Sequence, residues 1–357
     1  MQPCRVPKLA PMLFFLLPLL RLTTLSSAWA PVYRNITVDQ QGRGDFRWVQ
    51  PAVDSVPDGN RGWVRIHVKA GEYREKVTIP RSKEFILLEG EGYWTTQISF
   101  DGHAHPSVAE IMSRGGAAVD KMVSGGDGDA STTFSSATFT VLADNFMARD
   151  IAFKNTYNMV NLSRPDQAVA ALVAGDKAAF HGCAFFGYQD TLCDYLGRHY
   201  FRGCYVMGAV DFIFGFGQSI YDGCTVVSNM PAAAGEHAQP GWVTAHARPN
   251  ASSPGGLVFN GCAVLGTGRQ YLGRAWNQHA AVVFHRTFMS AVVVPEGWDA
   301  WNAGGNLWQV TFAEDECAGL GANTSRRVAW EKKLSQSEVQ RFVDIRFIDD
   351  GWLSKSP

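Results

Sequence analysis

The sequence predicts an all-β fold, a parallel β-solenoid in which short strands coil into stacked rungs. Three observations predict it: a recurring aromatic-x-Gly-Cys motif, short β-branched and aromatic runs between its copies, and few amphipathic helices in that region. The 357 residues include 36 glycines, and 46% are hydrophobic against 18% charged, as in globular proteins. A period of about 20 residues fits rungs that bury an interior only by stacking on one another.

The repeat is clearest in the middle of the chain. Its four copies are Phe180–Cys183, Phe201–Cys204, Tyr221–Cys224 and Phe259–Cys262. Successive cysteines are 21, 20 and 38 residues apart, so the last interval is interpreted as nearly two periods.

Other segments extend the same pattern in both directions. Strands are expected at Val64–Val68, Val77–Ile79, Phe85–Leu88, Ala137–Leu142, Ile151–Phe153, Ala168–Ala174, Tyr205–Met207, Phe212–Phe214, Thr225–Val227 and Val282–Phe284. Near the C-terminus, Ser335 and Glu338 form a capping box that predicts a short helix over Glu338–Val343. A β-sandwich would need hairpin-linked alternating strands and an α/β barrel eight long helices, so the solenoid is preferred.

The N-terminal 30 residues have the pattern of a secretory signal peptide. Arg5 and Lys8 precede the apolar run Pro11–Leu20, and Ala28–Ala30 provides an A-x-A cleavage site. The apolar run is shorter than the about 20 residues of a spanning helix, and no later segment comes close. We therefore expect residues 1–30 to be removed and residues 31–357 to form one exported domain without a membrane partner.

Charge and cysteine content limit the partners and the compartment. Loss of the signal peptide removes three of 32 basic residues and no acidic one, leaving 29 basic against 33 acidic residues. Nucleic acid is therefore not expected as a partner, because phosphate binding needs a basic footprint. Six cysteines remain, an even number that permits disulfides without fixing their pairing. Potential glycosylation sites lie at Asn35, Asn161, Asn250 and Asn323.

Two aspartates occupy the same phase of the repeat. Asp190 follows Cys183 by seven residues, and Asp211 follows Cys204 by seven. Strands of adjacent rungs lie about 4.8 Å apart, so both carboxylates could reach one reacting centre. One pKa is then expected to rise while the other stays low, which gives an acid together with a base or nucleophile. The alternative is a pair of turn aspartates, but large apolar neighbours favour a functional role.

Five motifs in order resemble the plant pectin methylesterase (pectinesterase) family. They are Gly71–Glu75 (GEYRE), Gln167–Ala170 (QAVA), Gln189–Leu192 (QDTL), Asp211–Gly215 (DFIFG) and Leu272–Trp276 (LGRAW), within a similarity that runs from Ile36 to Asp349. The resemblance implies a single-stranded right-handed parallel β-helix. It also implies the form of the family without an N-terminal inhibitor-like pro-domain.

The resemblance also implies the catalytic residues. Asp211 matches the nucleophile and Asp190 the general acid/base. Gln167 and Gln189 match the glutamines that stabilise the oxyanion, and Arg274 matches the arginine that pairs with the nucleophile. At Ala275 the chain departs from the family, which usually has proline there, but both flanking functional side chains are kept.

Substrate, partners and compartment follow from the same resemblance. Thr133, Gln167, Arg274 and Trp276 are expected to contact pectin, that is, methyl-esterified homogalacturonan. A Cys224–Cys262 disulfide is implied, together with a monomer secreted to the cell wall and a proteinaceous pectinesterase inhibitor as a candidate partner. No cofactor or metal is expected, since the histidines and cysteines lack metal-site spacing.

The expected reaction is hydrolysis of galacturonate methyl esters in pectin, which releases methanol and leaves free carboxylates. Two other classes stay open. A β-helix pectin depolymerase would need a chain-cleaving carboxylate group or a calcium-binding acidic cluster with a nearby base. A non-catalytic pectin-binding solenoid would lack part of the site, whereas all five catalytic positions are filled here. Cys193 is not expected to act as a nucleophile, because the sequence offers it no obvious base.

Overall fold

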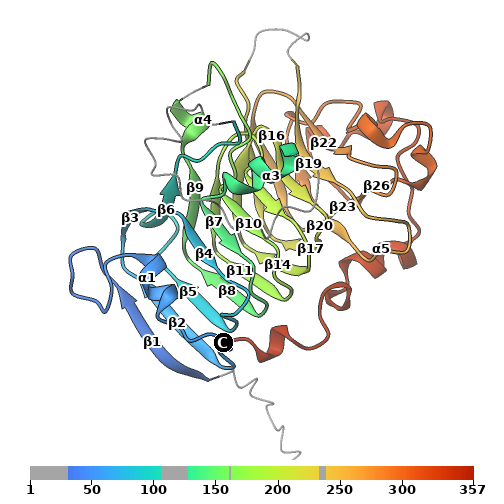
Figure 1. Cartoon of the computed structure of the whole chain (residues 1–357). Coiled ribbons are helices and arrows are strands. Elements are labelled where there is room, and N and C mark those ends of the chain that lie inside the picture. The colour runs from blue at the N-terminus through green and yellow to red at the C-terminus, as the bar shows by residue number, and fades with distance from the viewer. Residues whose placement is uncertain (1–30, 106–127, 161, 233–238) are drawn as a thin grey trace, which may run out of the picture.

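The protein is a right-handed parallel β-helix built from three sheets (Figure 1). This computed structural model describes residues 31–105, 128–160, 162–232 and 239–357, with the backbone alone for residues 128–131. The expected signal peptide and the sequon asparagine Asn161 lie outside the described residues. The predicted solenoid is confirmed, since the strands pair in parallel with those one rung before and after, except at the ends of each sheet, where a strand has one such neighbour.

Each rung passes through sheets I, II and III in turn. Sheet I has ten strands: β1 (Val32–Val38), β2 (Trp63–Val68), β5 (Ile86–Glu89), β8 (Phe146–Arg149), β11 (Ala178–His181), β14 (Arg198–Arg202), β17 (Gln218–Asp222), β20 (Gly256–Asn260), β23 (Ala281–His285) and β26 (Thr311–Asp315). Sheet II has eight: β3 (Gly71–Arg74), β6 (Thr96–Phe100), β9 (Ala152–Asn155), β12 (Ala184–Phe186), β15 (Tyr205–Gly208), β18 (Thr225–Asn229), β21 (Ala263–Thr267) and β24 (Phe288–Met289). Sheet III also has eight: β4 (Val77–Ile79), β7 (Phe139–Val141), β10 (Ala171–Val173), β13 (Leu192–Asp194), β16 (Val210–Gly215), β19 (Gly241–His246), β22 (Gln270–Ala275) and β25 (Trp298–Asp299).

In the residues that the structure describes, helices are few and short. They are α1 (Val49–Asp54), α3 (Gly128–Ser135), α4 (Tyr157–Val160) and α5 (Gln336–Val343), with 3-10 turns η2 (Trp301–Ala303), η3 (Leu307–Gln309), η4 (Leu320–Ala322), η5 (Thr324–Arg326), η6 (Ile345–Phe347) and η7 (Leu353–Lys355). The predicted C-terminal helix is confirmed as α5, and its Ser335–Glu338 capping box is formed. In the part of the chain that the structure describes, no helix has the length and apolar character to cross a membrane.

The structure explains each position of the repeated motif. The aromatic residue stacks on its counterpart one rung away, as in Phe201 over Tyr221, with ring centroids 4.5 Å apart and planes 3° from parallel. The glycine has a left-handed backbone, with φ near +59° at Gly203, where a side chain would be strained. The cysteine is buried, and its thiol donates to the carbonyl of the aromatic residue one rung earlier, as from Cys224 Sγ to Phe201 O at 3.3 Å.

Two expectations about the cysteines are wrong. The long interval between Cys224 and Cys262 is one rung rather than two, because β18 pairs directly with β21 and loops lengthen that rung. The implied Cys224–Cys262 disulfide is also not formed. Both residues are free thiols, and each donates to a backbone carbonyl of the preceding rung instead, with Cys262 Sγ lying 3.3 Å from Tyr221 O.

The C-terminal segment covers the outer face of sheet I. Helix α5 packs on β20 and β23, and the chain then runs back along the sheet towards its N-terminal end (Figure 1). Ile348 packs with Ile220 and Val258, and farther along Trp352 packs with Trp63. This segment therefore covers sheet I, whereas the candidate site lies at sheet III.

Candidate active site

The two aspartates lie on adjacent rungs, as the phase of the repeat predicts. Gln189 bridges Val210 in parallel, and Leu192 pairs with Ile213, so Asp190 and Asp211 occupy equivalent positions at sheet III. Both have left-handed backbones, with φ of 61° and 48°. Such conformations are uncommon for residues other than glycine and persist where the surrounding structure holds them.

Arg274 binds Asp211 through two hydrogen bonds. Its Nε lies 2.7 Å from Asp211 Oδ1, and its Nη2 donates to Oδ2, in the bidentate geometry that guanidinium and carboxylate groups favour. Arg274 reaches Asp211 from β22, across the intervening strand β19. Only 11% of the arginine side chain and 3% of the aspartate side chain are exposed, so the ion pair is largely shielded from water.

Burial and neighbouring charges set the protonation of the pair. Burial raises the pKa of Asp211 to about 6, although the Arg274 guanidinium acts to lower it. Burial and the charge of Asp211 raise the pKa of Asp190 well above its ordinary value. The expectation that one pKa stays low is therefore wrong, because burial outweighs the arginine. Asp211 still ionises first, since it alone of the two is bound to the guanidinium.

Gln167 and Gln189 lie beside the aspartates, and their side-chain amides are free to donate hydrogen bonds. The backbone carbonyl of Gln189 accepts from Ala168 N at 3.2 Å, which joins the two glutamine segments across one rung. Within the described residues, neither side-chain amide has a hydrogen-bond partner, and both side chains are partly exposed. The two amides can therefore donate to a bound group.

An apolar floor continues from the aspartates along the outward face of sheet III. Leu172, Cys193, Phe214 and Ala245 follow one another in register on successive strands, and the row continues with Arg274 and then Asp299. Burial raises the pKa of the Cys193 thiol well above its usual value, so this group stays protonated within the floor.

Trp276 and Thr133 lie at the edges of this floor. The Trp276 ring packs on Phe214, with centroids 5.6 Å apart, and is partly exposed. Thr133 is buried in α3, which is tied to the Gln167 segment because Ser136 Oγ accepts from Val169 N at 3.0 Å. The structure thus brings Trp276 to the floor directly and places Thr133 on a neighbouring helix.

Two tryptophans, which no sequence pattern indicated, enclose Arg274. The guanidinium carbon lies 4.4 Å from the centre of the Trp242 ring and 3.8 Å from that of Trp301, within the range of cation–π attraction. Asp299 fixes both tryptophans, accepting from Trp242 Nε1 at 2.9 Å and from Trp301 N at 3.0 Å. Trp301 is 50% exposed, so its ring also borders solvent at the site.

This arrangement has the parts that acyl transfer requires. An ionisable carboxylate held by arginine can act as a nucleophile, a protonated carboxyl can supply a proton, and two free amides can stabilise an oxyanion. Carried on the outer face of a parallel β-helix, these groups define the class of protein as an ester hydrolase.

Comparison with known proteins agrees with that class, and the chain belongs to the pectinesterase family, whose profile matches residues 35–109 and 105–351. The chain is 44% identical over 330 residues to "Probable pectinesterase 29" of Arabidopsis thaliana, covering 91% of this chain and 90% of that protein. It is 43% identical over 328 residues to "Probable pectinesterase 55" of the same plant, covering 90% and 91%. Among solved structures, the pectin methylesterase from carrot aligns with a TM-score of 0.74 and 30% identity, covering 89% of this chain and 94% of that one.

Proposed function

We propose that this pectinesterase hydrolyses galacturonate methyl esters in pectin with Asp211 as nucleophile and Asp190 as general acid/base. The observation that carries the assignment is the stacked pair of buried aspartates, of which only Asp211 is bound by a guanidinium. That asymmetry gives each carboxyl a different task, because the arginine favours the ionised form of one and burial favours the neutral form of the other.

The first half of the reaction forms an acyl-enzyme. An oxygen of ionised Asp211 attacks the ester carbonyl carbon, and the side-chain amides of Gln167 and Gln189 donate to the oxyanion that develops. The tetrahedral intermediate then breaks its bond to the methoxy oxygen. Protonated Asp190 gives its proton to that oxygen, so methanol leaves and an anhydride links the galacturonoyl group to Asp211.

The second half restores the enzyme. Asp190, now a carboxylate, takes a proton from water while the water oxygen attacks the galacturonoyl carbonyl. Collapse of this intermediate releases a galacturonic acid unit, which loses its proton to solvent to become the carboxylate, together with ionised Asp211, and Asp190 again carries its proton. Arg274 pairs with Asp211 before attack and after release, and Trp242 and Trp301 hold the guanidinium in place.

The apolar floor and its aromatic edge form the proposed substrate groove. Trp276 and Trp301 offer partly exposed rings on which sugar units can pack, and Thr133 lies on the helix beside the Gln167 segment. Pectin is therefore the proposed partner, bound along the outer face of sheet III. A proteinaceous pectinesterase inhibitor is proposed to act by covering the same face.

The proposed setting is the plant cell wall. Residues 1–30 serve as the signal peptide, and residues 31–357 act as a secreted, monomeric catalytic domain. Asn35, Asn250 and Asn323, the sequon asparagines in the described part of the chain, are all exposed, which supports glycosylation during export.

Methanol release set against chain shortening tests the proposed reaction. Purified mature protein incubated with highly methylated pectin should release methanol while the polymer keeps its length. Shortening of the chain without methanol would establish a depolymerase, and binding without either product would establish a non-catalytic pectin-binding solenoid.

A further inference from the structure

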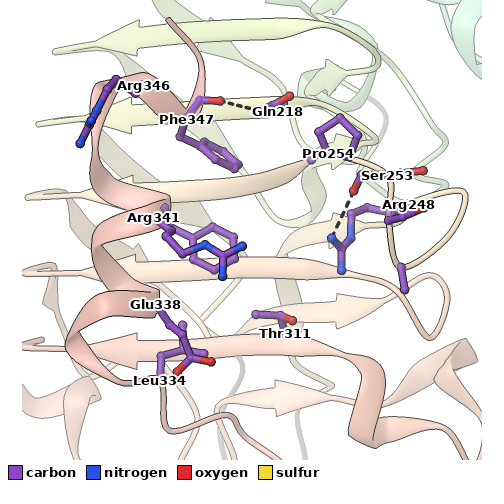
Figure 2. Close-up of a pocket in the computed structure, with 14 residues that line it drawn as sticks. Gln218, Arg248, Ser253, Pro254, Thr311, Leu334, Glu338, Arg341, Arg346 and Phe347 are labelled. Carbon is purple, nitrogen blue, oxygen red and sulfur yellow. Dashed lines mark hydrogen bonds between the residues drawn. The ribbon is translucent and has the colours of Figure 1, made fainter.

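A cationic cavity lies outside the candidate active site, between the C-terminal helix and sheet I. Its volume is about 490 Å³, within the size range of ligand pockets. Residues Ala251–Gly255 form one wall, and α5 and η6 form the other (Figure 2). Arg248, Arg341 and Arg346 line it, whereas none of the candidate catalytic residues does.

Arg248 carries a positive charge that no described carboxylate neutralises. Its Nε donates to His279 O at 2.5 Å and its Nη1 to Ser253 O at 3.3 Å, so its partners are backbone carbonyls. Burial lowers the pKa of Arg248, which reflects the free-energy cost of a partly desolvated cation. An anion in the cavity would offset that cost.

Arg341 faces the same cavity from α5 and forms no hydrogen bond or ion pair with any described residue (Figure 2). Arg346 differs, because Asp344 binds it through Nε at 2.9 Å and Nη2 at 2.5 Å. The one acidic residue of the lining, Glu338, accepts from the amide and hydroxyl of Ser335 at 2.8 and 2.7 Å, and it interacts with the charge of Arg341 without a hydrogen bond or ion pair between them. Two cationic side chains therefore face the cavity without a bonded carboxylate.

The cavity adjoins the proposed substrate groove through the backbone. Arg248 O accepts from Asn277 Nδ2 at 2.7 Å, and Asn277 directly follows Trp276 at the edge of the floor. The loop that carries Arg248 is therefore joined directly to the edge of the proposed groove.

We propose that this cavity is a second binding site that takes a free galacturonate carboxylate of de-esterified pectin, with Arg248 and Arg341 as its cationic contacts. This inference rests on the proposed function, whose product is that anion. Guanidinium groups pair with carboxylates in a planar, charge-assisted geometry, whereas a methyl ester offers them no charge. The site therefore distinguishes product units from substrate units, and it favours stretches of pectin that have already lost their methyl groups.

Trigalacturonate titrated into ¹⁵N-labelled mature protein tests this site by nuclear magnetic resonance. The backbone amides of Ser252, Ser253 and Gly255 report on the cavity, and those of Gln189 and Thr191 report on the active site. We expect both sets of amides to shift with trigalacturonate. The cavity set should respond at least about tenfold more weakly to inorganic phosphate. It should also respond at least about tenfold more weakly to the fully methyl-esterified trimer, titrated into Asp211→Asn protein so that the ester is not hydrolysed during the measurement.

Two variants give the matched comparison. Arg341→Gln should raise the dissociation constant measured at the cavity amides about tenfold and leave the one at the active-site amides unchanged. Arg346→Gln, which removes an arginine already neutralised by Asp344, should change either constant less than about twofold and keep wild-type methanol release.

The results that would overturn the site are equally specific. Cavity amides that do not shift, that respond equally to the esterified trimer, that respond to phosphate alone, or that respond alike in wild type and Arg341→Gln would each refute it. Failure of the wild-type protein to release methanol would refute the proposed function instead. The shifts of the cavity amides would still decide whether the cavity binds the carboxylate.

Discussion

Replacing Arg274 with glutamine should shift the acid side of the pH–rate profile towards higher pH. The substitution removes the charge that keeps Asp211 ionised in a site where the two side chains are only 11% and 3% exposed. Unit charges about 4 Å apart attract by about 4 kcal/mol at an effective dielectric of about 20. At about 1.4 kcal/mol per pH unit, that attraction corresponds to a shift of about three pH units.

Hydrogen bonds from the new amide compensate in part, so we expect the acid limb to move by about two to three pH units. With the pKa of Asp211 at about 6 in the wild type, turnover at pH 7 should then fall about 10- to 100-fold. Methanol release measured from pH 4 to pH 9 provides the profile. Arg274→Lys is the matched control, because it keeps the charge and should retain more activity. An acid limb that stays in place in Arg274→Gln, with equally mild losses in both variants, would show that the arginine is only structural.

Three further predictions concern the amide, the acid and the fold. Gln189→Ala should lower turnover by about 10² to 10³ if its amide stabilises the oxyanion, and an effect confined to KM would show that it only binds substrate. Asp190→Asn should remove the alkaline limb from any residual activity. It should also raise the melting temperature at pH 7. The folded-state pKa of Asp190 lies above its unfolded value, so the wild type loses stability as the pH rises between these two values, and asparagine removes that loss. A lower melting temperature at pH 7 would contradict this. Gly203→Ala should lower the free energy of unfolding by about 1 kcal/mol in urea titrations, since φ is +59° and nothing lies within 4 Å of the added methyl group; no loss would contradict a strained left-handed position.

The sequence predicted the solenoid and the stacking of Asp190 on Asp211 because both follow from one periodic pattern. In parallel strands paired in register, residues at the same distance from a repeated motif lie at equivalent positions on neighbouring rungs. Asp190 and Asp211, each seven residues after a motif cysteine, therefore stack on one another. The pairing of Arg274 with Asp211 needed the family resemblance, since the two lie on β22 and β16 with β19 between them.

Features outside the periodic region could not be predicted in the same way. Trp242 and Trp301 enclose Arg274, but Trp242 lies on β19 of the lengthened rung and Trp301 lies in a 3-10 turn, so neither shares a phase with the motif. The interval before Cys262 misled for the same reason, because loops lengthen a rung without adding strands. The pKa of Asp211 depends on burial at the packed site, which residue spacing does not report.

Methanol release by Asp211→Asn tests the central claim most directly. The amide keeps the shape of the side chain and removes the nucleophile, so we expect a loss of at least about 10³ in turnover. The melting temperature of the variant should stay above the assay temperature, so that the variant is folded during the assay. Asp54→Asn, at the exposed end of α1, provides the matched control and should behave as wild type. Methanol release by Asp211→Asn at a near-normal rate, from a protein that melts like the wild type, would contradict the assignment of Asp211 as the nucleophile.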